Sequence, residues 1–124
     1  MCAILLSINP NHVENILNGT KTYEFRKKDC KNPVDKILIY STNPIMRVVG
    51  EAEVEDVLID NPEIIWKKTE KKSGIDKIFF DQYFGNREQA VAYKLKNVIK
   101  YIEPRELKDY GISSAPQSFQ YLEE

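Results

Sequence analysis

Three charged side chains lie close together in the segment Gly19-x-Lys21-x-x-Glu24-x-Arg26. Glu24 and Arg26 are two residues apart in an alternating segment, so a strand would place them on one face, ~7 Å apart. Lys21 leads into that face through the turn after Gly19. Lysine and arginine bind phosphate, and arginine can do so with two parallel hydrogen bonds. A carboxylate beside them can orient the lysine, accept a proton or bond to a base edge.

The same pattern also has a purely structural interpretation, in which an exposed strand face carries ion pairs. The spacing is compatible with this interpretation and with a cleft shared by the three charges. The elements around the segment decide how the charges are presented.

Two elements lead up to the charged segment. Ala3–Ile8 is a short apolar run, typical of a strand buried on both faces. Asn9 and Pro10 favour a helix start, because asparagine caps a helix and proline suits its first position. The helix is expected to end at Gly19, and its apolar stripe consists of Val13, Ile16 and Leu17. The one histidine, His12, is expected to face solvent on this helix.

The rest of the chain is expected to be mainly β. The predicted strands are Thr22–Lys27, Lys36–Ser41, Arg47–Ile59, Gln89–Ile102 and a short segment after Pro116, with a polar loop over Asp29–Asp35 and a bend at Gly50. Two further helices start at Asn61 and Asp76, and Trp66 is expected to lie in the core. Because no strand–helix–strand series repeats, we predict an α+β, mainly β fold, a small barrel of about five to six strands with flanking helices.

Composition narrows the class of protein. The chain has 124 residues, 42% hydrophobic and 30% charged, which is typical of one globular domain. Its formal net charge of −1 argues against a protein that coats duplex DNA by bulk charge, but leaves room for a local basic cleft.

The metal-ligating residues are few. The chain has two cysteines, Cys2 and Cys30, and one histidine, so we expect no structural zinc site and no cofactor. The cysteines are expected to be free thiols in a reducing compartment. No signal peptide is visible, and no apolar run approaches the ~20 residues that span a bilayer. We therefore expect a cytoplasmic protein without a membrane partner.

The charged segment resembles the GxKxxExR signature of the ASCH domain family, a relative of the PUA RNA-binding barrel. The resemblance extends, in order, over nearly the whole chain, which implies a single domain over residues 1–124. The other matching segments are Leu6-Ser7-Ile8-x-Pro10, Ile16-Leu17-Asn18-Gly19, Lys36–Ser41, Val49-Gly50-Glu51 and Pro116-Gln117-Ser118-Phe119, the last similar to a closing motif of a bacterial and archaeal branch.

The resemblance implies a PUA-like β-barrel with a cleft beside the first helix, lined by the signature charges. It also implies binding of RNA or of a nucleotide, a role in RNA metabolism or transcription, and a protein partner in a regulatory complex. One branch of the family is an amidohydrolase of acylated cytidine, and ribonuclease activity is known in the family. Lys21 matches the lysine of that branch, whereas Glu24 stands where the branch has threonine; Glu51 and Glu53 are candidates for its later glutamate.

Three function classes follow. In a binding module, Lys21 and Arg26 would contact the phosphate. The base or the sugar would be bound by Glu24, Gln117 and Ser118. In a small hydrolase acting on a modified nucleoside or on RNA, Lys21 and Glu24 would be catalytic. In a protein-interaction domain the charges would bind no ligand. Three residues near the expected cleft, each with an alternative structural role, complete the candidate ligand-binding set: Ser7, Tyr40 and Ser41.

Overall fold

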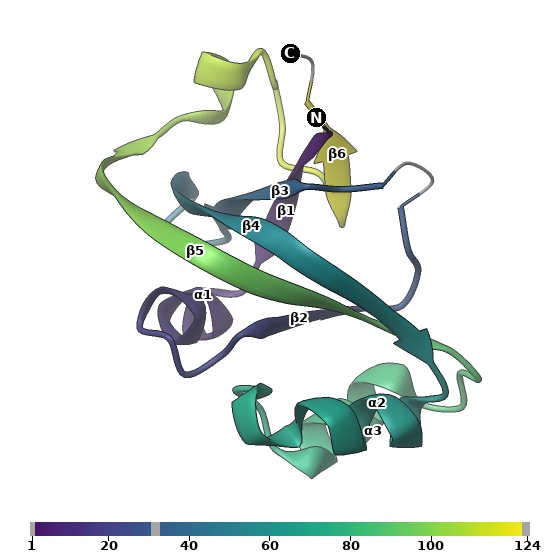
Figure 1. Cartoon of the computed structure of the whole chain (residues 1–124). Coiled ribbons are helices and arrows are strands. Elements are labelled where there is room, and N and C mark those ends of the chain that lie inside the picture. The colour runs from purple at the N-terminus through teal and green to yellow at the C-terminus, as the bar shows by residue number, and fades with distance from the viewer. Residues whose placement is uncertain (1, 31–32, 123–124) are drawn as a thin grey trace.

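The computed structural model describes residues 2–30 and 33–122, so residues 31 and 32 of the predicted polar loop lie outside the described part. Within it, one six-stranded sheet has the order β2-β5-β4-β3-β1-β6 (Figure 1). The strands are β1 (Ala3–Ile8), β2 (Tyr23–Arg26), β3 (Lys36–Ser41), β4 (Arg47–Asp60), β5 (Ala90–Arg105) and β6 (Phe119–Tyr121). The helices are α1 (Pro10–Leu17), α2 (Pro62–Thr69) and α3 (Lys77–Phe84), with 3₁₀ turns η1 (Glu70–Lys72) and η2 (Leu107–Tyr110).

The sheet curls into a half-barrel, which confirms the predicted fold class. The long strands β4 and β5 run antiparallel and sweep across the molecule in Figure 1. Their pairing shifts register between Val48 and Gly50, where a Cβ atom on the glycine would lie 2.5 Å from the backbone oxygen of Ile99. The predicted bend at Gly50 is therefore a place where two backbones approach closely, and such bulges increase the curvature of a sheet.

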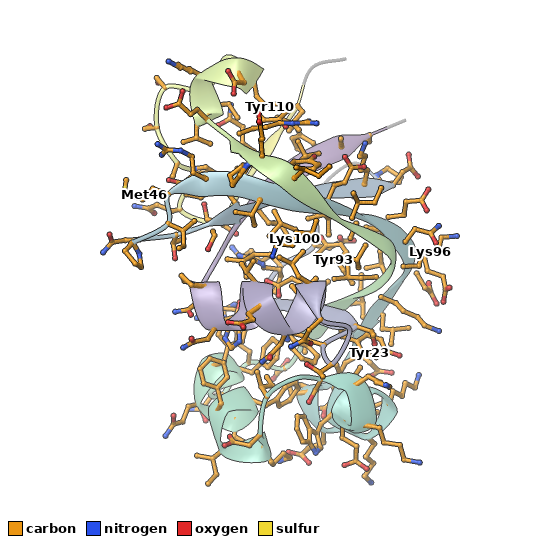
Figure 2. The ribbon with its side chains drawn as sticks, turned by 90° about the vertical axis from the view of Figure 1, so that its left-hand side faces the viewer. Tyr23, Met46, Tyr93, Lys96, Lys100 and Tyr110 are labelled. Carbon is orange, nitrogen blue, oxygen red and sulfur yellow. The ribbon has the colours of Figure 1, made fainter. Side chains whose placement is uncertain are left out.

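The helices begin where the sequence predicts. The side chains of Asn9, Asn61 and Asp76 cap α1, α2 and α3 by accepting hydrogen bonds from backbone N–H groups in the first turn. In Figure 2, α1 lies between the sheet and the pair formed by α2 and α3. In the described part of the chain, no helix is both long enough and apolar enough to cross a bilayer.

Buried side chains form a main core and two smaller clusters. The main cluster joins α1 to the sheet through residues such as Ile4, Ile16 and Tyr93. A second cluster lies between β2 and the α2–α3 pair and contains Phe25, Ile65, Phe80 and Phe84, with Trp66 packed against it as predicted. This second cluster fixes the α2–α3 pair against β2, so α3 faces the end of α1.

Candidate functional site

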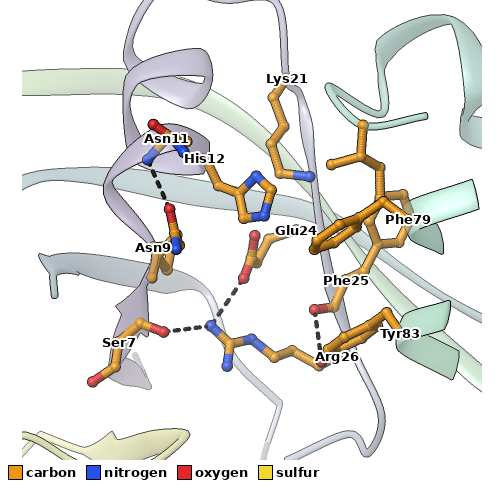
Figure 3. A pocket seen from close by; sticks show the side chains of 12 residues that line it. Ser7, Asn9, Asn11, His12, Lys21, Glu24, Phe25, Arg26, Phe79 and Tyr83 are labelled. Carbon is orange, nitrogen blue, oxygen red and sulfur yellow. Dashed lines mark hydrogen bonds and ion pairs between the residues drawn. The ribbon is translucent and has the colours of Figure 1, made fainter.

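A cavity of about 450 Å³ opens between α1, β2 and α3 (Figure 3). It brings together side chains that are far apart in the sequence. Its lining consists of Ser7, Ile8, Asn9, Asn11, His12, Lys21, Glu24, Phe25, Arg26, Ile75, Phe79 and Tyr83. The three charged residues of the signature and Ser7 therefore share one cavity, which we call the signature pocket.

Lys21 is almost fully buried at the wall of the signature pocket, with 2% of its surface exposed. Its ammonium donates a hydrogen bond to the backbone oxygen of Ser73 at 2.7 Å and lies 4.7 Å from the centre of the Phe25 ring. Burial lowers the pKa of Lys21, and the Arg26 charge lowers it further, while the Glu24 carboxylate opposes the shift. A buried lysine with a weakened hold on its proton is suited to binding an anion or to moving a proton.

A tight loop after η1 holds the Lys21 ammonium. The Ser73 hydroxyl donates to the Ile75 oxygen at 2.8 Å, which folds the loop back on itself. The N–H of Thr22 donates to the Lys72 oxygen at 2.9 Å and ties the loop to the start of β2. The loop therefore presents its carbonyl to Lys21 from a fixed position.

Arg26 and Glu24 form an ion pair at the opposite end of the pocket. One guanidinium nitrogen, NH2, lies 2.9 Å from Oε2 of Glu24 and donates to the Ser7 oxygen at 3.0 Å. Only 6% of Glu24 is exposed, so this is a nearly buried carboxylate. Among the described residues, Nε of Arg26 is the one buried side-chain nitrogen or oxygen without a hydrogen-bond partner. A buried donor without a partner costs about 1–3 kcal/mol, so the site favours a ligand that accepts a hydrogen bond from this nitrogen.

Helix α1 contributes a residue that the sequence misplaces. We expected His12 to face solvent, but its ring points into the signature pocket and meets Phe79 edge-on, with ring centres 5.2 Å apart (Figure 3). Burial lowers the pKa of His12, and the positive charge of Lys21 lowers it further. The imidazole is therefore mainly neutral near pH 7, the form that accepts a proton.

Helix α3 supplies an aromatic wall that the sequence analysis also missed. Phe79 and Tyr83 are four residues apart, so they share one face of the helix, and that face lines the pocket. The Tyr83 hydroxyl donates to the Phe25 oxygen at 3.4 Å. Phe80 and Phe84, on the adjacent face, are buried in the core. In the sequence, the spacing of Phe79 and Tyr83 next to that of Phe80 and Phe84 indicates two adjacent aromatic faces on this helix, and this pattern could have predicted the wall.

The structure places the other predicted ligand-binding residues outside the pocket lining. Tyr40 and Ser41 are buried, because β3 is a central strand covered on both faces. Tyr40 packs in the third cluster of buried residues, with Leu38, Tyr101 and Ile112. Neither Tyr40 nor Ser41 lines the signature pocket, so their predicted contact with a ligand stays a prediction. Gln117 and Ser118 are exposed, but their segment contacts Ser7 at the pocket rim. The Ser7 hydroxyl donates to the Pro116 oxygen at 2.7 Å, and the Ser7 backbone N–H donates to the Ser118 oxygen at 3.2 Å.

Glu51 and Glu53, the candidates for the later glutamate of the amidohydrolase branch, lie outside the signature pocket. Glu51 and Glu53 line a different cavity, together with Lys36 and Asn97. Glu51 already lies 2.7 Å from the Lys36 ammonium and accepts a hydrogen bond from the Tyr101 hydroxyl at 2.9 Å. Neither glutamate lines the signature pocket, so the arrangement expected from the amidohydrolase branch is not reproduced there. The described residues include no cluster of three or more side chains arranged to hold a metal ion.

The sequence matches the ASCH domain family over residues 6–105. An "ASCH domain-containing ribonuclease" of Zymomonas mobilis is 27% identical over 122 residues, which is 95% of this chain and 82% of that protein. The crystal structure of ASCH from Zymomonas mobilis superimposes with a TM-score of 0.89 at 25% identity and covers 98% of this chain and 88% of that one.

Two longer Ureaplasma parvum proteins contain a similar segment. The large ribosomal subunit protein uL22 is 34% identical over 120 residues, and ATP synthase subunit alpha is 31% identical over 120 residues. The chain spans only 39% and 15%, respectively, of these two relatives. Their names therefore transfer no activity to this chain.

Proposed function

The chain belongs to the ASCH domain family, and we propose that its signature pocket binds one nucleotide of a single-stranded RNA. The observation that carries this proposal is the convergence of two cations, one carboxylate and an aromatic wall in one cavity. A cavity of about 450 Å³ is of the size that holds small ligands, and it is concave, so one unstacked nucleotide suits it better than a duplex.

The phosphate would lie between Lys21 and Arg26. Each is held by a backbone oxygen, that of Ser73 and that of Ser7, so neither side chain needs to be ordered when an anion binds. A phosphate oxygen beside the guanidinium would also give the unpaired Nε of Arg26 an acceptor. Both features favour an anionic ligand over a neutral one.

The base would lie against the wall formed by Phe79 and Tyr83. Phe79 is 44% exposed, so part of its ring surface is accessible to a ligand. Stacking of a base on an aromatic ring contributes ~1–3 kcal/mol. The Glu24 oxygen that is not paired with Arg26, Oε1, could accept from a ribose hydroxyl or a base edge.

Cleavage of RNA is the second candidate function. It is supported by the relative from Zymomonas mobilis, which carries the name ribonuclease, and by the lowered pKa of Lys21. Hydrolysis of a modified nucleoside is less well supported, because Glu24 replaces the threonine of that branch and the later glutamates lie outside the pocket.

Equilibrium binding of a fluorescent single-stranded RNA tests the proposal. We expect Lys21→Met, which keeps the side-chain stem, to weaken RNA binding about 10- to 100-fold, the loss of one hydrogen bond to a charged group. Lys67→Met, on the exposed face of α2, is the matched control and should change affinity less than threefold. Equal affinities of the wild type and Lys21→Met would argue for binding elsewhere, and no RNA binding would favour the protein-interaction class.

A further inference from the structure

His12 is held in a fixed orientation in the signature pocket. It lies in the first turn of α1, whose start is capped by Asn9. The edge of its ring packs against Phe79 from the opposite wall. Figure 3 shows the imidazole between the α1 backbone and the charged residues of β2. In the described part of the chain neither ring nitrogen has a hydrogen-bond partner. The imidazole therefore presents unused proton-accepting capacity to the cavity.

Charged and titratable groups face His12 from every side of the pocket. Burial and the positive charges of Lys21 and Arg26 disfavour protonation of the imidazole, and Glu24 favours it. Tyr83 comes from α3, and burial raises the pKa of its hydroxyl, so that it stays protonated near neutral pH. The pKa of His12 is therefore lowered, mainly by burial, and the imidazole is mainly neutral at pH 7. A neutral imidazole can accept a proton as a general base, and two cations beside it can stabilise an anionic substrate.

We propose that His12 is the general base of an RNA-cleaving reaction in the signature pocket and takes the proton of the ribose 2′-hydroxyl group. The inference rests on the proposed function, because it needs a ribonucleotide in this pocket. It assigns the base to α1, outside the GxKxxExR segment, and it defines the substrate class as RNA with a free 2′-hydroxyl.

The proposed step balances without a further reactant. His12 accepts the 2′-hydroxyl proton, the O2′–P bond forms and the P–O5′ bond breaks. The departing 5′-oxygen takes a proton from the Lys21 ammonium, and exchange with water returns both side chains to their starting states. Arg26 and the Lys21 ammonium stabilise the additional negative charge on the phosphorus oxygens in the transition state. The products are a 2′,3′-cyclic phosphate and a 5′-hydroxyl end.

The test uses the full chain, a labelled single-stranded RNA and the same RNA with 2′-O-methyl groups. Binding is measured by anisotropy, cleavage by gel and the new ends by mass spectrometry. The variants are His12→Ala and, as a control on the same helix, Glu14→Gln, whose side chain is exposed and outside the pocket. Added imidazole distinguishes a missing base from a damaged fold, because it can enter the space left by His12→Ala.

We expect the wild type and Glu14→Gln to cleave RNA to cyclic-phosphate ends and to bind the 2′-O-methyl RNA without cleaving it. His12→Ala should bind RNA within threefold of wild type and cleave it about 10²–10⁴-fold more slowly, with recovery in imidazole. Full cleavage by His12→Ala, or binding without cleavage by the wild type, would overturn the role of His12 and leave the proposed binding function intact. Absence of RNA binding by the wild type would overturn both.

Discussion

Gly74 and Lys21 are in direct contact: a Cβ atom at position 74 would lie 2.5 Å from the Cβ of Lys21. Position 74 also has a φ of +70°, a backbone conformation that residues other than glycine rarely adopt. We expect Gly74→Ala to lose ~1 kcal/mol of folding stability from the backbone and ~1–3 kcal/mol more from the collision. Because the collision displaces Lys21, RNA affinity should fall as well. Urea unfolding and RNA titration measure the two effects.

Gly111→Ala provides the control for this variant. Gly111 has a similar φ of +72°, but a Cβ atom there would meet nothing within 4 Å. It should show only the backbone cost of ~1 kcal/mol and bind RNA normally. Equal destabilisation by the two substitutions would show that contact with Lys21 has no energetic consequence.

Arg26→Lys tests whether the shape of the guanidinium matters. Its NH2 group contacts both Glu24 and the Ser7 oxygen, and a lysine ammonium has neither the planar fork nor the same reach. We expect RNA affinity to fall about tenfold, whereas Arg87→Lys, outside the pocket lining, should bind as the wild type does. If the RNA affinity of Arg26→Lys were unchanged, Arg26 would act only through its positive charge and not through the shape of its guanidinium group.

The pH dependence of stability tests the environment of His12. The pKa of His12 is lowered in the folded protein from its ordinary value of 6.5, so in the interval between the two values only the unfolded chain binds the proton. The free energy of unfolding should therefore rise with pH through this interval, and the loss on acidification is complete below the folded-state pKa. Compared with His12→Gln, the wild type should lose stability between pH 7 and pH 5. Parallel stability profiles for the two proteins would contradict the burial of His12.

The salt dependence of RNA affinity reports how many phosphates of the RNA the protein neutralises. For single-stranded nucleic acids, the slope of log affinity against log salt is about −0.7 per neutralised phosphate. Lys21→Met should therefore make the slope shallower by ~0.7, and Lys67→Met should leave it unchanged. An unchanged slope for Lys21→Met would mean that this ammonium neutralises no phosphate.

The sequence predicts much of this fold because its signals are local. Asn9, Asn61 and Asp76 each mark a helix start through their own side chain, and the bounds of β1 and β3 follow from continuous apolar runs. The strand order is less accessible, because it depends on contacts between distant segments. The parallel pairing of β1 with β3, for example, leaves no local trace in either strand.

The sequence predicts only the part of the candidate site that lies in the GxKxxExR segment. Lys21, Glu24 and Arg26 are close in sequence, so a strand and a turn bring them together. His12 lies beside the apolar stripe of α1, and periodicity cannot distinguish a solvent-facing residue there from one that faces another helix. It lines a pocket because α3 lies opposite, held by the packing of Phe80 and Phe84 on Phe25. The burial of Tyr40 is hard to predict for a related reason, because the cluster around its side chain includes Tyr101 and Ile112 from the C-terminal third of the chain.

A crystal structure of the protein with a ribonucleoside 3′-monophosphate shows whether the signature pocket binds a nucleotide. We expect a phosphate within hydrogen-bonding distance of both Lys21 and Arg26, with the base against Phe79 and the 2′-hydroxyl facing His12. A nucleotide bound elsewhere, for example along the exposed lysines of α2 and η1, with an empty signature pocket, would contradict this expectation.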